Sequence, residues 1–314
     1  MKSRSISDRL TKTIKNQLRE THFVRLIVAV SGGADSTALL SLLKNAGVET
    51  VAAHCNFHLR GEESNRDQSH IEEICRRLNV PLEIIHFDVK EYIRLHPGIS
   101  TEMACRELRY DWFGSIIQKY DADRVAVAHN ADDNIETLFL NLLRGSGTSG
   151  LRGMLPDNGN VWRPLLNISR TEIEKYLQEV DLDYITDSTN LENDYRRNFL
   201  RNEVIPLLKS RWEGFDKALS KSIAFLRAEN SVVEQAIDKL LPPDGSPLAS
   251  ETVLDFPNPA LLVRRFISPL LPFSTTPDEV VAAMKADKPD VRRWQLKKGK
   301  IELRNRKLFL KKDV

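Results

Sequence analysis

The sequence contains little cysteine, and its cysteines are far apart. The three residues, Cys55, Cys75 and Cys105, form no C-x-x-C pair anywhere in 314 residues. Zinc and iron–sulfur sites need clustered thiolates, so these spacings exclude the common versions of both. An odd number of separated thiols also argues against a disulfide framework and indicates a reducing compartment.

Long hydrophobic runs are missing as well. No stretch of about 18 consecutive apolar residues occurs, which excludes an ordinary membrane-spanning helix. Residues 1–18 are polar and basic and lack the apolar segment of a secretory signal peptide. We therefore expect a cytoplasmic protein with no membrane partner.

The chain as a whole carries no large excess of one charge, but its C-terminal end does. The formal net charge is +2, so the average predicts no class of partner. Residues 281–314, however, contain twelve Lys/Arg and four acids, a local net charge of +8. Either a solvated basic surface or contact with the phosphates of a nucleic acid would explain this excess.

Apolar runs alternate with helical patterns through the first half of the chain. Short apolar and β-branched runs predict strands at 26–30, 48–54, 82–89 and 124–128. Apolar residues at helical spacing predict helices at 6–18, 36–45, 66–78, 101–120 and 132–144. This alternation is typical of an α/β, Rossmann-like fold with a parallel sheet covered by helices on both faces.

The pattern changes after residue 159. Ser169 and Glu172 have the spacing of a capping box and predict a helix over 169–180. A long apolar stripe predicts a further helix over 215–241, which ends at a Pro/Gly-rich linker.

The remaining C-terminal residues predict a second, smaller domain. A helical pattern spans 258–270, and alternating apolar residues over 298–312 predict a β-hairpin. We place a domain boundary near Glu213. Residues 1–213 would then form the α/β domain, and residues 214–314 a mainly helical domain that ends in the hairpin.

A glycine-rich turn connects the first predicted strand to the helix after it. The turn consists of Ser31, Gly32, Gly33, Ala34, Asp35 and Ser36. Its backbone N–H groups and the helix N-terminus attract anions, although a tight turn that only caps the helix would use the same residue types. No lysine follows the glycines and the spacing is not G-x-G-x-x-G, which excludes two common nucleotide-binding motifs.

The strand followed by S-G-G-A-D-S resembles the PP-loop of the N-type ATP pyrophosphatases, enzymes that split ATP between the α- and β-phosphates. Further blocks over roughly the first 210 residues resemble, in order, those of the tRNA(Ile)-lysidine synthetase branch of this family. They include HCNFHLRGEES from His54, TEMACRELRY from Thr101, AHNADDNIETLFLNLLRGSGTSGLRGM from Ala128, WRPLLNISRTEIEKYL from Trp162 and YITDSTNLENDYRRNFLRNEVIPLL from Tyr184.

The resemblance implies an ATP-dependent ligase. It would adenylate the C2 carbonyl oxygen of the wobble cytidine in a tRNA(Ile) with a CAU anticodon, and L-lysine would then displace AMP. The product, lysidine, changes decoding from AUG to AUA. The resemblance also implies that Asp35 binds Mg²⁺ and that ATP contacts the turn together with Ala53, His54, Arg144 and Gly145.

Two pairs of charged residues at helical spacing are candidates for the lysine site. Asp133 and Glu136 lie three residues apart, as do Arg106 and Arg109, so each pair shares a helix face. By resemblance, all four are catalytic together with Asp35, and lysine would bind Asp133, Glu136 and Arg106. A solvated acidic helix start and surface ion pairs would explain the same spacings.

Contact with tRNA is the predicted role of two basic segments. Arg196, Arg197, Asn198 and Arg201 lie in an Arg-rich stretch, whose guanidinium groups suit phosphate and loop contacts. Lys297 and Lys298 are the candidates in the basic C-terminal end. Surface charges at a helix start explain the first segment equally well.

Three other functions stay open at this point. An amide-forming PP-loop ligase or a tRNA thiolase would use the same ATP chemistry, but the chain shows no glutaminase segment and no C-x-x-C pair. A nucleotide sensor without catalysis would not need Asp35 together with the acidic group at 132–136. The sequence is also compatible with a homodimer.

Overall fold

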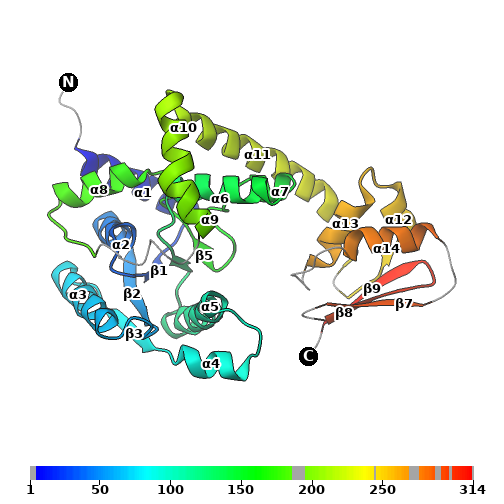
Figure 1. Cartoon of the computed structure of the whole chain (residues 1–314), viewed down its shortest axis with the longest axis horizontal. Coiled ribbons are helices and arrows are strands. Elements are labelled where there is room, and N and C mark those ends of the chain that lie inside the picture. The colour runs from blue at the N-terminus through cyan, green and yellow to red at the C-terminus, as the bar shows by residue number, and fades with distance from the viewer. Residues whose placement is uncertain are drawn as a thin grey trace. The chain divides into compact units, whose positions relative to one another are not determined.

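A five-stranded parallel sheet organises the first part of the computed structural model (Figure 1). Its strands, in spatial order β3-β2-β1-β4-β5, are β3 Leu82–His86, β2 Glu49–Asn56, β1 Arg25–Ala29, β4 Arg124–Ala126 and β5 Val161–Trp162. Every neighbouring pair runs parallel. The predicted α/β fold is therefore confirmed, while β5 went unpredicted because two residues carry no periodicity.

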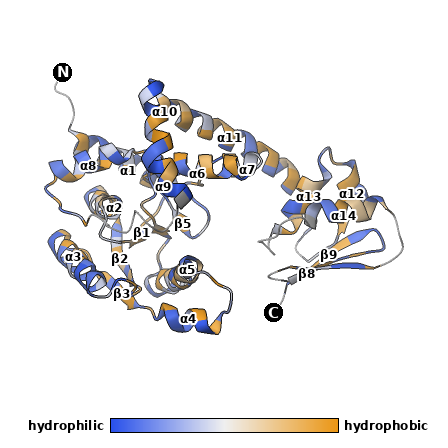
Figure 2. Ribbon diagram, in the orientation of Figure 1, coloured by the Kyte–Doolittle hydropathy of each residue, from blue (hydrophilic) through white to orange (hydrophobic). Residues whose placement is uncertain are grey.

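The structure describes residues 5–185, 195–243, 245–268, 276–286, 291–296 and 299–312, without the side chains of Tyr195 and Thr276. The first part contains the helices α1 Ile6–Thr21, α2 Ala34–Ala46, α3 Glu62–Leu78, α4 Val89–Leu95, α5 Thr101–Tyr120, α6 Ala131–Leu143, α7 Thr148–Leu151, α8 Arg170–Glu179, α9 Tyr195–Phe199, the π-helix η2 Leu200–Val204, α10 Ile205–Arg211 and α11 Phe215–Asp238. Both hydrophilic and hydrophobic residues occur along the whole of α8 and α11, as expected of amphipathic helices (Figure 2).

Two apolar cores lie on opposite faces of this sheet. Leu26 and Val28 of β1 pack in the core formed with α1, α2, α3 and α8. Ile27, between them in the sequence, packs with Phe113 and Ile116 of α5. Successive residues of a strand point to opposite faces, so β1 is buried on both sides, as its continuous apolar run predicts.

Two helices that reach the functional region begin with capping boxes. The Ser169 hydroxyl accepts a hydrogen bond from the Glu172 backbone, and the Glu172 carboxylate accepts one from the Ser169 backbone, which confirms the prediction for α8. Asn130 and Asp133 make the same reciprocal pair at the start of α6. This second box went unpredicted, because Asn and Asp are less typical of the motif than Ser and Glu.

An antiparallel sheet characterises the C-terminal part. Its strands, in the order β6-β9-β8-β7, are β6 Leu248–Ala249, β9 Lys307–Lys312, β8 Gly299–Arg304 and β7 Arg292–Leu296, and its helices are α12 Ser250–Asp255, α13 Pro259–Phe266 and α14 Thr276–Lys285. The β8–β9 pair is the predicted hairpin, with Ile301 opposite Leu310 and Leu303 opposite Leu308.

The chain divides into two compact units, Met1–Arg227 and Ala228–Val314. Helix α11 contributes residues to both units. The domain boundary expected near Glu213 stays a prediction. None of the described helices has the length and apolar character that a membrane crossing requires.

Candidate functional site

The turn between β1 and α2 can be built only with glycine at position 32. Gly32 has a positive φ of 83°, and a Cβ there would lie 2.7 Å from the Ile185 side chain. Its carbonyl accepts a hydrogen bond from the Ile185 backbone at 2.9 Å and one from the Thr37 hydroxyl at 3.4 Å. The turn is therefore fixed by α2 and by the chain that follows α8.

The two serines of the turn bond to each other and to its backbone. The Ser31 backbone N–H donates to the Ser36 hydroxyl at 3.1 Å, and the two hydroxyl oxygens lie 3.2 Å apart. The Ser36 hydroxyl also donates to the Gly33 carbonyl at 3.0 Å. Gly33 is the N-cap of α2, so unpaired N–H groups of the first helical turn lie beside this rigid loop.

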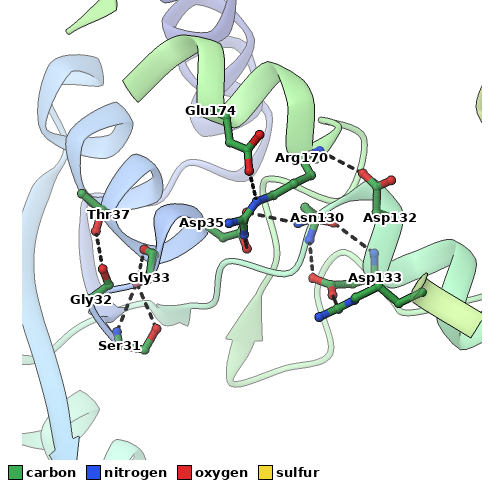
Figure 3. A network of polar contacts seen from close by, with 12 residues as sticks. Ser31, Gly32, Gly33, Asp35, Thr37, Asn130, Asp132, Asp133, Arg170 and Glu174 are labelled. Atoms are coloured by element: carbon green, nitrogen blue, oxygen red, sulfur yellow. Dashed lines mark hydrogen bonds and ion pairs between the residues drawn. The ribbon is translucent and has the colours of Figure 1, made fainter. Parts of the chain in front are cut away.

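Asp35 projects from the first turn of α2 toward two other elements (Figure 3). One carboxylate oxygen accepts from the Asn130 side-chain amide at 3.1 Å, and the other pairs with the Arg170 guanidinium. Burial raises the pKa of Asp35, while Arg170 and Asn130 oppose the rise. The side chain is 24% exposed, so it remains accessible to a cation.

Arg170, the first residue of α8, joins three elements and went unpredicted. Its guanidinium pairs with Asp35 and, at 2.8 Å, with Glu174. Its backbone N–H donates to Asp132 at 2.9 Å. The pair with Glu174 has the i, i+4 spacing of a helix, but the sequence gives no signal for the contact with Asp35, which lies 135 residues away.

The acidic start of α6 is neutralised by cations from later helices. Glu136 is 2% exposed, and its oxygens lie 2.8 Å from the Arg197 Nε and 2.6 Å from the Arg201 Nε. Asp133 pairs with Arg201 at 3.0 Å. The negative charges of Asp133 and Glu136, which share one helix face, are therefore offset by arginines of the chain itself.

Two predicted groups thus contact each other directly. The residues assigned to lysine, Asp133 and Glu136, pair with two of those assigned to tRNA, Arg197 and Arg201. A ligand ammonium group at these carboxylates would compete with the two guanidinium groups. Asp132 pairs elsewhere, with Lys209 at 2.8 Å.

A cleft of about 660 Å³ opens beside the turn, along the carboxyl ends of the strands. In parallel sheets this edge is where ligands bind. Of the residues predicted from the sequence, the cleft is lined by Ser31, Asp35, Ser36, Ala53, His54, Arg106 and Arg109. These residues come from β2, α5 and the turn, and the fold brings them to one cavity.

The arginines of α5 lie against aromatic rings in the cleft wall. The Arg106 guanidinium is 4.9 Å from the centre of the Tyr110 ring, and that of Arg109 is 5.3 Å from the Phe57 ring. Such contacts hold a guanidinium in place without neutralising its charge. Both groups therefore remain available to anionic oxygens.

The cysteine in the cleft is not a thiolate. Burial raises the pKa of Cys55 to about 12, although the nearby Arg109 opposes the rise. Because the thiolate is the nucleophile, Cys55 has little reactivity at neutral pH. Burial also raises the pKa of Cys75, to about 11.

Two histidines of the cleft are held by hydrogen bonds. The His54 Nδ1 lies 3.0 Å from the Val30 carbonyl oxygen, and burial lowers the pKa of this imidazole. The Nδ1 of His129 accepts a hydrogen bond from the Nε of Arg163 at 3.2 Å. Burial, with four arginines that include Arg163, lowers the pKa of His129 to about 4.

The other predicted residues lie elsewhere. Arg144 and Gly145 follow α6 at the end opposite to Asp133, are exposed, and do not line the cleft, so their contact with ATP stays a prediction. Arg196 is exposed and Asn198 half-buried on α9. Lys297 and Lys298 lie outside the described residues.

The residues around Asp35 fit Mg²⁺ only in combination with a phosphate ligand. Among the described residues no group of three or more His, Cys, Asp or Glu is placed to hold a metal ion. Mg²⁺ is commonly held by one or two carboxylates, with phosphate oxygens and water completing its shell. Asp35, half-buried beside the turn, provides one such carboxylate.

Comparison with known sequences finds a family over most of the chain. Residues 4–208 match the PP-loop domain family. The chain is 43% identical to the tRNA(Ile)-lysidine synthase of Bacteroides thetaiotaomicron over 250 residues, which is 78% of this chain and 58% of that protein. It is 38% identical to that of Chlorobaculum tepidum over 242 residues, 73% of this chain and 71% of that protein.

The chain spans about half the length of several other curated relatives that it matches. Among solved structures, the U34-tRNA thiolase NcsA of Methanococcus maripaludis is similar with a TM-score of 0.59 and 16% identity. The match covers 71% of this chain and 80% of that one. At this identity the likeness supports the fold alone.

Proposed function

The chain belongs to the tRNA(Ile)-lysidine synthase family of PP-loop proteins, and we propose that it ligates L-lysine to C2 of the wobble cytidine of a tRNA(Ile) with a CAU anticodon. The observation that carries the proposal is one cleft lined by Ser31, Asp35 and Ser36 of the turn and by the two α5 arginines. It combines an anion-binding turn with free positive charge, as an ATP-dependent transfer requires.

In the first step, the C2 carbonyl oxygen of cytosine attacks the α-phosphorus of ATP. The bond from this phosphorus to the oxygen shared with the β-phosphate breaks, and pyrophosphate leaves. The backbone N–H groups of the turn and the Ser31 hydroxyl would hold the leaving pyrophosphate, while Arg106 and Arg109 offset charge on the α-phosphate. Mg²⁺, when bound at Asp35, supplies further neutralisation of the phosphates.

In the second step, the neutral ε-amine of lysine attacks C2. The bond from C2 to the oxygen now carried by AMP breaks, AMP leaves with that oxygen, and the amine loses a proton. Asp133 and Glu136 would hold the lysine α-ammonium and Arg106 its carboxylate, which fixes the amine near C2. This requires Arg197 or Arg201 to give up part of its ion pairing.

The tRNA would be held outside the reacting centre by basic side chains and one amide. Arg196 and Asn198 on α9, together with Lys297 and Lys298 near the C-terminal end, are the proposed contacts. Arg197 and Arg201, once released from Glu136, would add guanidinium groups that suit phosphate oxygens. Localisation in the cytoplasm and assembly as a homodimer stay predictions.

The test is the release of AMP and pyrophosphate by the full chain with ATP, Mg²⁺ and a tRNA(Ile) transcript with a CAU anticodon. Product formation should depend on the transcript and should proceed to repeated turnover only when lysine is present. A transcript with a different wobble base is the matched control. Turnover with ammonia or a sulfur donor in place of lysine would support the amide-forming or thiolating alternatives and contradict the proposal.

A further inference from the structure

Arg163 and His129 form a pair at the carboxyl-end edge of the sheet. His129 lies between β4 and the cap residue of α6, and it lines the cleft. Arg163 directly follows β5 and is 8% exposed. The proposed function uses neither side chain, although both lie next to the residues that it does use.

The chemistry of arginine decides which nitrogen of His129 carries the proton. A guanidinium group has only donors, and its pKa keeps it charged in proteins. Because the Arg163 Nε donates to the His129 Nδ1 at 3.2 Å, this nitrogen must have its lone pair free and carry no hydrogen. In a neutral imidazole the hydrogen is then on Nε2.

Arg163 is itself held in a fixed position. Its Nη1 donates to the Leu155 carbonyl at 2.9 Å, and its backbone N–H donates to the Pro156 carbonyl at 2.7 Å. A guanidinium anchored in this way fixes the imidazole plane as well as its tautomer.

We propose that Arg163 is a positioning residue that holds His129 as the neutral Nε2–H tautomer, and that this N–H is a donor to an anionic phosphate oxygen in the cleft. This inference rests on the proposed function only for the identity of the ligand. Among the described residues, the Nε2 of His129 has no hydrogen-bond partner in the protein. A donor that lines a cavity and is unpaired within the protein is available to a ligand.

The charges around His129 favour an anionic ligand. The largest charge effects on its pKa come from Arg163 after β5, Arg106 and Arg109 on α5, and Arg197 on α9, all of them positive. This surrounding charge opposes an imidazolium, which would be a fifth cation. A phosphate oxygen accepts from a neutral N–H and gains from the guanidinium groups of the cleft wall, Arg106 and Arg109, so the site suits the phosphates of ATP.

The same geometry argues that His129 is not a general base. A base must offer a lone pair to the substrate, and the lone pair of this imidazole is used by Arg163. The deprotonation of the lysine amine therefore falls to another group or to water. A donor role and a base role predict opposite tautomers, which makes the proposal measurable.

The first test is spectroscopic and needs no substrate, so its outcome is independent of the proposed function. Long-range ¹⁵N–¹H spectra of the full chain with ¹⁵N-labelled histidine distinguish the two tautomers, and His129→Gln assigns the signal among seven histidines. We expect the Nε2–H form in the unsubstituted chain. An Nδ1–H signal would overturn the proposal.

Arg163→Met removes the donor while retaining much of the side-chain volume. We expect a mixture of the two His129 tautomers and a rise in the pKa of His129 toward its ordinary value of about 6.5. Arg163→Lys should restore part of the original signature, because a cationic donor remains. Arg94→Met, at an exposed ion pair, is the control and should leave the signal unchanged. An identical His129 signal in Arg163→Met and the unsubstituted chain would refute the role of Arg163.

A second test keeps the proposal falsifiable if Arg163→Met does not fold. His129→Leu removes the donor and should lower the rate of AMP formation by about a hundredfold, as for loss of one donor to a developing anion. His129→Gln restores an N–H near the Nε2 position and should recover a large part of this loss. If Gln is as impaired as Leu, a donor role is wrong and a base role is favoured.

Discussion

Two buried glutamates, one in each compact unit, show how differently the units use charge. Glu136 in α6 is 2% exposed and pairs with Arg197 and Arg201. Glu302 in β8 is 4% exposed, and its side chain pairs with Arg293 and Arg304. Each glutamate alone would be costly to bury, and each is offset by more than one cation.

The difference lies in the neighbours of each glutamate. Around Glu136 acids and bases are equal in number: the two acids Asp133 and Glu136 meet the two guanidinium groups of Arg197 and Arg201. Around Glu302 three cations, Arg293, Arg304 and Lys311, meet one acid. An equal set suits a zwitterion such as lysine, whereas a surplus of cations suits phosphates.

The largest predicted effect is at Asp35, in the same compact unit as Glu136. Asp35→Ala should lower AMP formation by at least about a hundredfold, because the carboxylate proposed to hold Mg²⁺ is lost. The fold should persist, since the side chain is only half-buried. The assay is AMP release with ATP, tRNA and lysine. Asp181→Ala, at a side chain 98% exposed, is the control, and equal rates for both variants would remove Asp35 from the site.

The next effect compares the two glutamates directly. Glu136→Gln should lower the free energy of unfolding by about 3 kcal/mol, because Arg197 and Arg201 lose a buried partner. Glu302→Gln should cost less, since Arg293 is 68% exposed and its charge is solvated. Urea unfolding measures both. A larger loss for Glu302→Gln would contradict the assignment of Glu136 as the more tightly held residue.

A pH effect is expected from the cleft wall, where cations surround His129. Its pKa is lowered to about 4, so the unfolded chain binds a proton that the folded chain does not between about pH 6.5 and 4. Stability should therefore fall by about 2 to 3 kcal/mol as pH decreases through this window and be fully present above it. The free energy of unfolding of His129→Gln should not show this decrease between about pH 6.5 and 4. An unchanged pH profile in the variant would show that His129 does not titrate abnormally.

The smallest effect is expected from the surplus cations of the C-terminal end. Neutralising Lys297, Lys298 and Lys300 together should weaken tRNA binding and reduce the slope of log K against log salt by up to about 2. Removing three charges from α1, at Lys12, Lys15 and Arg19, is the matched comparison and should alter the slope less. Equal changes in the two variants would show a general charge effect, and an unchanged slope in the first would defeat the proposed contact.

Much of the fold can be predicted because its signals are local. The apolar run of β1, the Ser169–Glu172 capping box and the alternation in the β8–β9 hairpin each depend on residues close in sequence, and all three are confirmed. The short strand β5 escaped prediction, because two residues cannot show a period.

The partners of the site residues could not be predicted in the same way. Helical spacing placed Asp133 and Glu136 on one face, but nothing local indicates that Arg197 and Arg201, more than 60 residues later, neutralise them. Arg163 beside His129 is a further example. Such pairs are set by where the fold brings distant segments, and a single sequence carries no record of that.

The most direct test of the account is the mass of the wobble nucleoside after reaction. The full chain is incubated with ATP, Mg²⁺, lysine and the tRNA(Ile) transcript, and the tRNA is digested and analysed by mass spectrometry. The account predicts a cytidine that has gained one lysine and lost one water, at the wobble position alone. An unmodified cytidine, or one that has gained ammonia or sulfur instead, would contradict it.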